Sequence, residues 1–198
     1  RLPPPPAQWW CTAKAARADI AWTNARTPQS KIAVGVQLDA ASVKGFALDS
    51  VDTRLSYSNN TGTVDLGVWQ DHVREYSLAG DYVLRLDEKE LRLARSQLRF
   101  DTTVWRGTRT AAIRWGARGI EVRNLELRNG ANGRIYANGL LPTKGNASLQ
   151  VAIDNFQVAD IAGLLESDLP FDGLFSVNGT IEGTLNGATY QGKLGGVP

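Results

Sequence analysis

The 198-residue sequence is short of the side chains that most enzyme chemistry requires. Cys11 is its single cysteine, so no disulfide can form within the chain, and we expect this residue to be a small buried hydrophobe. Histidine also occurs once, at His72 in "WQDHVREY", with no serine or cysteine nucleophile motif beside it. One histidine and one cysteine leave no typical zinc ligand set, and the chain has no Walker, H-E-x-x-H or G-x-S-x-G motif. We therefore expect no enzymatic activity, no metal and no cofactor, and a surface role for His72.

Methionine and long apolar runs are lacking as well. The chain has no methionine and opens on Arg1, which favours a processed product or a piece of something longer. Its apolar runs are all shorter than the roughly 18 residues that a membrane-spanning helix needs. Charge of one sign is lacking too, because 22 basic and 20 acidic residues leave a net charge of +2. This balance does not favour nucleic acid as a partner.

Proline is concentrated at the start of the chain. Residues 1–8 include "RLPPPP", whose four consecutive prolines favour an extended polyproline conformation and cannot join the middle of a sheet. We expect residues 1–8 to form a proline-rich arm or linker.

Alternation of apolar and polar residues dominates the remainder. In "KIAVGVQLD" and again in "ASLQVAID", every second residue is apolar, which is typical of a strand with one face in contact with apolar material. The same alternation favours a strand in the second half of "PAQWWCTAKAARADIAW". The segment "VADIAGLLESDLP" instead has apolar residues at helical spacing, so we expect one short helix near 158–166.

In the segment 119–141, "GIEVRNLELRNGANGRIYANGLL", a cluster of glycines and asparagines interrupts the alternation of apolar and polar residues. This pattern predicts two strands joined by "NGANG". Ile120 and Val122 occupy even positions, whereas Leu125 and Leu127 occupy odd ones. If Ile120 and Leu125 both face the apolar side, a bulge must lie between them, near Arg123.

Two kinds of adjacent pair, arginine beside tryptophan and aspartate beside glutamate, are expected to have structural rather than binding or catalytic roles. Neighbouring residues of a strand point to opposite faces. We therefore expect Trp105 and Trp115 to pack inward while Arg106 and Arg114 stay in solvent. The pair Asp87–Glu88 is interpreted as a solvated turn between strands rather than as catalytic carboxylates.

The pattern as a whole predicts an all-β fold, with many strands and little helix to cover the apolar face. That face must be buried against a second sheet, against the same sheet curled over on itself, or against a bound apolar ligand. Glycines on the apolar side favour curling, and a long curled sheet offers a groove suited to acyl chains. The residues expected to face this groove are Val34, Val36, Leu38, Leu55, Tyr57, Val64, Leu66, Tyr82, Leu84, Leu98, Phe100, Ile135, Leu149, Val151, Ile153, Phe175, Val177 and Ile181.

From about residue 111 to residue 194, the chain resembles the C-terminal repeats of the TamB-like proteins, within the AsmA-like group of envelope proteins. The resemblance rests on "IRWGARGIEVRNLELRNGANGRIYANGLLP", "LQVAIDNFQVADIAGLL", "GLFSVNGTIEGTL" and "YQGKL". It implies a β-taco, a U-shaped sheet with an apolar inner face, built from a divergent β repeat over 9–105 and a second repeat over 106–198. It also implies a periplasmic location in a diderm bacterium, tethered to the inner membrane by an anchor outside this chain.

Three functions remain open at this stage. The first is a non-enzymatic lipid-binding module that holds or conducts acyl chains during envelope biogenesis. The second is a structural subunit that docks on a membrane protein complex, such as an outer-membrane assembly partner, from the periplasmic side. The third is a β-helix or adhesin-like passenger of a secreted protein, which would require a steadier rung period than this sequence has.

Overall fold

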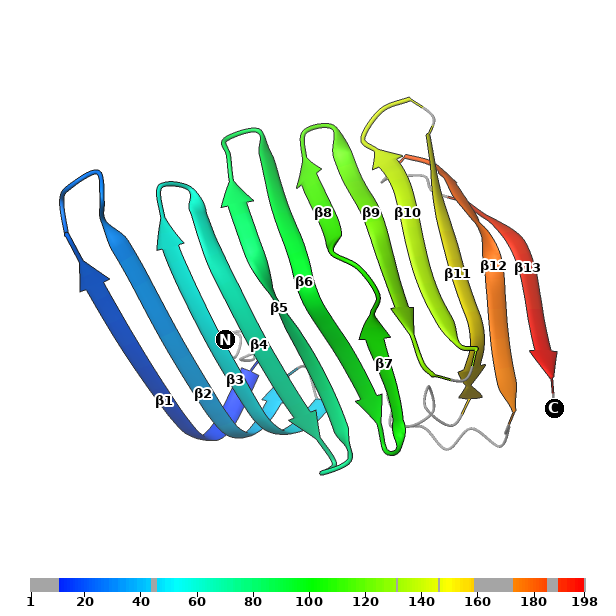
Figure 1. The fold of residues 1–198 in the computed structure, drawn as a ribbon, viewed down its shortest axis with the longest axis horizontal. Helices are drawn as coiled ribbons and strands as arrows, with labels where there is room; N and C mark the ends of the chain where they lie inside the picture. The colour runs from blue at the N-terminus through cyan, green and yellow to red at the C-terminus, as the bar shows by residue number, and fades with distance from the viewer. Residues whose placement is uncertain are drawn as a thin grey trace, which may run out of the picture.

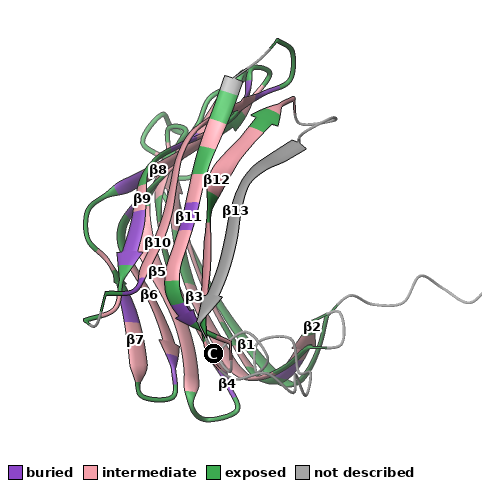
Figure 2. Ribbon diagram, turned by 90° about the vertical axis from the view of Figure 1, so that its right-hand side faces the viewer, coloured by how far each residue is buried: buried purple, intermediate pink, exposed green. Residues whose placement is uncertain are grey.

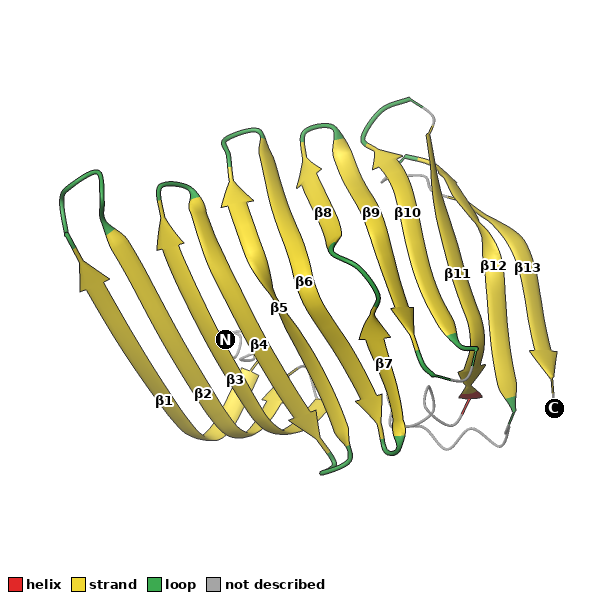
Figure 3. Ribbon diagram, viewed as in Figure 1, coloured by secondary structure: helices red, strands yellow, loops and turns green. Residues whose placement is uncertain are grey.

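The protein is all-β in the computed structural model, which describes residues 11–43, 46–130, 132–145, 147–158, 173–184 and 189–197. These residues form thirteen strands in a single antiparallel sheet (Figures 1 and 3). The fold class predicted from the alternation is confirmed. A β-helix is excluded for this part of the chain, because its strands would be parallel and stacked in rungs.

The strands are long, and most are joined by short turns. They are β1 (Cys11–Thr23), β2 (Lys31–Val43), β3 (Phe46–Ser58), β4 (Thr61–Gln70), β5 (Arg74–Leu84), β6 (Glu88–Phe100), β7 (Thr103–Gly107), β8 (Ala111–Gly116), β9 (Gly119–Arg128), β10 (Arg134–Pro142), β11 (Ala147–Gln157), β12 (Leu174–Gly183) and β13 (Thr189–Val197).

The sheet is a meander in which each strand except β7 and β8 pairs with the strands before and after it, and β7 and β8 do not pair with each other. The order is β1-β2-β3-β4-β5-β6-β7-β9-β10-β11-β12-β13, and β8 pairs with β6 and β9. Both β7 and β8 run antiparallel to β6 and β9, so together they occupy one strand position that is interrupted at residues 108–110. The backbone N–H of Thr108 donates to the carbonyl of Glu126 at this interruption. The boundary expected between residues 105 and 106 falls inside β7.

Strand pairing assigns every side chain to one of two faces, because directly opposed residues point the same way. Val34 on β2 pairs with Leu55, and Leu55 pairs with Val64. Farther along the sheet, Val122 on β9 is opposed to Ile113 and Gly139. We call the face that carries these residues the apolar face, and the opposite side, which carries most of the charged residues, the polar face.

The phase flip in β9 is a bulge, as the sequence predicts. Leu125 pairs with Ala137 and Val122 pairs with Gly139, so β9 holds one more residue than β10 over this interval. The additional residue allows both Val122 and Leu125 to lie on the apolar face. Asn124 adopts a left-handed conformation, with φ 55°, and its N–H donates to Oδ1 of Asn138 at 3.2 Å.

A second bulge of the same kind lies in β11. Ile153 pairs with Val177 and Phe156 pairs with Phe175, again with one additional residue on one strand. Asn155 has φ 51°, and its N–H donates to the hydroxyl of Ser176 at 3.1 Å. The bulge sends Ile153 and Phe156 to the same face. An asparagine therefore resets the apolar face in both strands.

The sheet is open and bent rather than packed into two layers. Figure 2 shows it from the side, with its strands curved and the β1–β2 end displaced from the β8–β9 region. The chain exposes 13254 Å² of surface. A compact globular protein of 21.5 kDa exposes about 9,200 Å². The chain therefore exposes more surface than a compact protein of its mass.

A small aromatic core lies on the apolar face between β5 and β11. Phe100, Trp105, Leu127 and Phe156 form its buried centre, and Trp105 is fully buried. The Trp105 ring stacks on the Phe156 ring with centroids 5.0 Å apart, although β9 and β10 lie between their strands. Three strand spacings amount to about 14 Å in a flat sheet. The contact therefore requires the sheet to bend toward the apolar face at this point.

Two sequence expectations about individual side chains are wrong. Cys11 is exposed rather than buried, because it begins β1 at the edge of the sheet. Trp115 lies on the apolar face but is 37% exposed, since no second layer covers it. Its neighbour Arg114 is the more enclosed of the two, held by Glu90 and Glu121. Trp105 and Arg106 follow the expectation, with the tryptophan buried and the arginine exposed.

Two other expectations fall largely outside the described residues. The proline-rich arm over 1–8 is one, and the helix near 158–166 is the other, with only Val158 described.

Candidate apolar binding face

All eighteen residues predicted to line a groove lie on the apolar face. Opposed residues on successive strands form one continuous face. This face runs from Val34 and Val36 on β2 to Val177 and Ile181 on β12. Bulges keep this face continuous. A register shift between β5 and β6 places Leu98 and Phe100 on the face of Tyr82, the bulge in β9 keeps Val122 with Leu125, and the bulge in β11 keeps Ile153 with Phe156. The predicted set is distributed over β2 (Val34, Val36, Leu38), β3 (Leu55, Tyr57), β4 (Val64, Leu66), β5 (Tyr82, Leu84), β6 (Leu98, Phe100), β10 (Ile135), β11 (Leu149, Val151, Ile153) and β12 (Phe175, Val177, Ile181).

The first strands expose this face most. Ile20 on β1 is 73% exposed and Trp22 is 61% exposed. Register places Ile20 in a row with Val34 and Leu55, and Leu55 is itself 38% exposed. Neither β1 residue was among the predicted groove residues, although the alternation in "ARADIAW" contains them both. They extend the apolar face to the edge of the sheet.

The sequence also did not predict that the aromatic residues around Trp105 form one core. Phe100 was predicted to face the groove, whereas Trp105, Leu127 and Phe156 were not singled out as its partners. Tyr76 meets Phe100 edge-on at 5.8 Å, and Phe100 meets Phe156 edge-on at 5.7 Å. Tyr76 and Phe100 lie on the paired strands β5 and β6, but no local pattern indicates the contacts of Phe100 and Trp105 with Phe156, since they join strands that are not neighbours. The core fills part of the apolar face between β5 and β11.

Gly62 on β4 shows how the apolar face accommodates a large ring. The Tyr82 ring lies directly over Gly62, and a Cβ at that position would be 2.5 Å from the tyrosine hydroxyl. The hydroxyl donates to the carbonyl of Ser56 at 2.7 Å. Burial raises the pKa of Tyr82 above its ordinary value. The phenol is therefore neutral at physiological pH and adds no charge to the apolar face.

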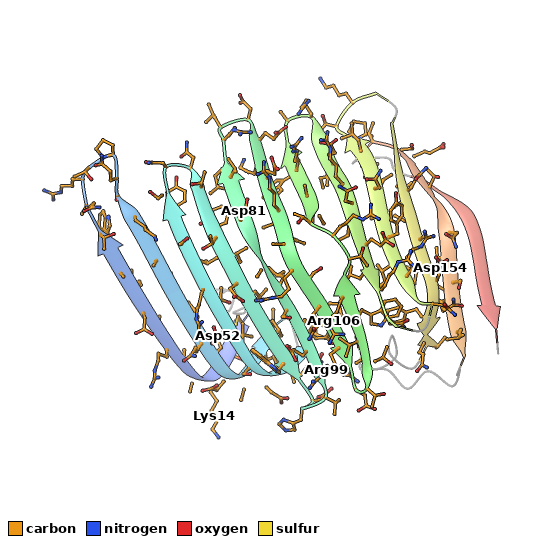
Figure 4. The ribbon with its side chains drawn as sticks, in the orientation of Figure 1. Lys14, Asp52, Asp81, Arg99, Arg106 and Asp154 are labelled. Carbon is orange, nitrogen blue, oxygen red and sulfur yellow. The ribbon has the colours of Figure 1, made fainter. Side chains whose placement is uncertain are left out.

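The polar face is a network of paired charges. Figure 4 labels Asp52, Asp81, Arg99, Arg106 and Asp154, which belong to this face and spread from β3 to β11. Arg134 on β10 pairs with Asp154 at 2.8 Å. Such cross-strand pairs stabilise neighbouring strands modestly.

Two glutamates at the centre of this network are almost fully buried. Glu90 is 3% exposed and lies between Arg92 at 2.6 Å and Arg114 at 3.1 Å. Hydrogen bonding from Arg92 holds the pKa of Glu90 below its ordinary value, against the opposing effect of burial.

Glu126 is 7% exposed and accepts from Arg128 at 2.6 Å and Arg109 at 3.0 Å. Hydrogen bonding from Arg128 lowers the pKa of Glu126 in the same way. Both carboxylates are therefore charged and fully engaged with arginines, an arrangement suited to holding strands together rather than to proton transfer.

Two hollows occur away from the predicted groove residues. One, of about 220 Å³, is lined by charged side chains that include Glu88, Arg114 and Arg118. The other, of about 540 Å³, lies at the ends of β7, β9 and β11 and is lined by Thr103, Asn129 and Asn155 among others. Neither brings together a nucleophile and a base.

Metal-ligating and membrane-spanning features were sought over the same residues. In the ranges that the structure describes, acidic, histidine and cysteine side chains form no group of three or more that could hold a metal ion. His72 is on the surface and lies 3.2 Å from Asp49. Among the described residues, no helix has the length and apolarity needed to cross a membrane.

Comparison with protein-family models, with curated proteins and with solved structures finds no match to this chain.

Proposed function

We propose that this chain is a non-enzymatic lipid-binding module whose apolar face forms the inside of a U-shaped groove for acyl chains. The observation that carries the proposal is the continuous apolar face, which runs through β2 to β12 with no second layer over it among the described residues. A sheet in water cannot leave such a face bare without a large free-energy cost. An acyl chain covers apolar surface without needing a specific partner group.

The energetics suit a ligand of this kind. Each methylene group transferred from water contributes about 0.8 kcal/mol, so a long acyl chain is held by area alone. Valine, leucine and isoleucine side chains dominate the predicted groove residues, and Tyr82 presents a neutral ring. The polar face, with its paired charges, would remain in solvent. Such a site needs no reactive group.

The resemblance to TamB-like proteins supports a setting for this activity. In that setting the module lies in the periplasm of a diderm bacterium, held at the inner membrane by an anchor outside this chain. It would bind or conduct lipid during outer-membrane biogenesis. The β-taco architecture of those proteins agrees in kind with a single bent antiparallel sheet.

Photo-crosslinking at paired neighbouring positions tests the proposal. A photoreactive residue would replace Leu55 or Val151 on the apolar face, and Arg54 or Gln150 on the polar face as matched controls. In cells with a periplasm, we expect lipid adducts at the two apolar positions, several-fold above the controls, detected by mass spectrometry. Equal labelling of both faces, or no lipid at Leu55 and Val151, would contradict the proposal.

A structural subunit is the second candidate function, and one surface favours it. Register places Leu84, Trp115 and Ile120 in one row across β5, β8 and β9, with Lys89 of β6 in the same row. The three apolar side chains are 37–38% exposed, and Leu86 at the adjoining turn is 95% exposed. A membrane protein complex could cover this row. Protein rather than lipid adducts from a photoreactive residue at Ile120 would favour this function.

A further inference from the structure

Among the strands whose exposure is described along their full length, β1 at the edge of the sheet is the most exposed. All thirteen residues of Cys11–Thr23 are exposed, and β1 pairs only with β2 among the described strands. An edge strand of this length presents a row of free N–H and C=O groups, and natural proteins usually protect such edges with proline, charge or a covering segment. Within the strand, proline is missing and the charged residues are Lys14, Arg17 and Asp19.

The charges on this edge are self-complementary. Arg17 and Asp19 lie on the polar face, one residue to either side of Ala18, because Ala18 pairs with Val36 of the apolar face. Two copies of β1 can pair antiparallel about a two-fold axis perpendicular to the sheet. With the axis at Ala18, each Arg17 lies opposite the partner subunit's Asp19, twice in the interface.

Neighbouring registers lack this match. With the axis moved by one residue to Arg17, two arginines are opposed, and with the axis at Asp19, two aspartates are opposed. Like charges directly opposite each other destabilise a strand pair. The register centred on Ala18 also gives a long overlap, from residue 13 to residue 23. The register centred on Arg17 would overlap over the whole of residues 11–23, so charge rather than overlap selects the register centred on Ala18.

We propose that the chain forms a two-fold symmetric dimer through antiparallel pairing of β1 with β1 of a second copy, centred on Ala18. This axis keeps the apolar faces of both copies on one side, so the two sheets become one. Ile20, now 73% exposed, gains the partner subunit's Ala16 as its neighbour on that side. Closed symmetric pairing also protects an edge that would otherwise recruit strands without limit.

Exchanging the charges of Arg17 and Asp19 tests the proposed dimer. Molecular mass would be measured by light scattering during size-exclusion chromatography over a range of concentrations. We expect the wild-type chain to be a dimer. Arg17→Asp opposes two aspartates and Asp19→Arg opposes two arginines, so each should raise the dimer dissociation constant by about tenfold or more. The double variant R17D/D19R restores unlike pairs and should return the constant to near the wild-type value.

Arg54→Asp is the matched control, because its side chain is exposed on the polar face of β3, away from the edge. It should leave the dissociation constant unchanged. Circular dichroism checks that each variant retains its sheet, which exposed positions should permit. A monomeric wild-type chain would overturn the proposal. The proposal would also be overturned if neither single substitution changed the dimer dissociation constant. It would equally be overturned if the double variant dissociated as readily as the single variants. The result does not depend on lipid, so it stands or fails apart from the proposed function.

Discussion

The two ends of the sheet have similar alternating sequences, but they differ in how much of their apolar side chains is buried. In β1–β4, alternating apolar residues yield an apolar face on which no apolar side chain is buried among those described, because Ala41, the one buried apolar side chain of these strands, shares the opposite face with Asp39. In β5–β11, alternation of similar strength yields the aromatic core around Trp105. Alternation alone thus determines which face a side chain occupies. Burial requires contact between strands that are not neighbours.

The difference has two visible causes. The second region carries bulges at Asn124 and Asn155, which allow its strands to bend while keeping apolar residues on one face. It also carries large rings, Phe100, Trp105 and Phe156, that reach across intervening strands. Among the described residues, the aromatic core and the side chains packed against it include none from β1–β4. The first region is therefore the part of the apolar face most available to a ligand.

Replacing Trp105 by alanine should cause the largest loss of stability among the changes that distinguish the two regions. Trp105 is fully buried and stacks on Phe156, so Trp105→Ala should lower the free energy of unfolding by about 3–5 kcal/mol. The measurement is urea unfolding followed by circular dichroism. Trp22→Ala is the matched control in the first region, where the ring is 61% exposed, and should change stability by no more than about 0.5 kcal/mol. Equal losses would show that the two regions are not packed differently.

Gly133, in the turn between β9 and β10, tests how tightly the core is closed. A Cβ on Gly133 would collide with the Trp105 ring and lie 2.6 Å from Nδ2 of Asn129. Gly133→Ala should therefore cost about 1–3 kcal/mol, measured by the same unfolding titration. At Gly130 in the same turn, an added Cβ meets nothing within 4 Å, so Gly130→Ala should be nearly neutral. A neutral Gly133→Ala would mean that the core is loose.

Buried carboxylates should make the second region sensitive to acid. The folded-state pKa of Glu90 and of Glu126 is lowered, so each contributes stability above its unfolded-state pKa. That contribution is lost as pH falls through the folded-state value. Glu90→Gln should cost about 1–2 kcal/mol at neutral pH and less in acid, where the wild-type carboxylate is also protonated.

Asp65→Asn is the control for this prediction. Asp65 pairs with Arg95 at 3.5 Å with both side chains more than half exposed, so its loss should be within about 0.5 kcal/mol. Unfolding titrations at a series of pH values give both comparisons. If the stability lost in Glu90→Gln did not shrink on acidification, the charge of Glu90 would not be its cause.

The sequence predicts the faces of this sheet better than its packing. Val34, Leu149 and Ile181 share a face because the side-chain period of a strand is fixed, and the bulge beside Asn124 follows from the same arithmetic. The exposure of Cys11 and Trp115 could not be predicted, since both depend on the lack of a covering layer. The stacking of Trp105 on Phe156 joins residues 51 positions apart and leaves no local signal.

The bulge at Asn124 is the most direct link from sequence to shape. Its φ of 55° is costly for a β-branched residue and easy for glycine. Asn124→Val should therefore cost about 1–2 kcal/mol. In Asn124→Gly, the backbone N–H can still donate to Asn138, and the change should be about 0.5 kcal/mol or less in either direction. If valine were tolerated as well as glycine, the left-handed conformation of residue 124 would not be what the bulge requires. The side-chain requirement for keeping Leu125 and Val122 on one face would then have to lie elsewhere in β9.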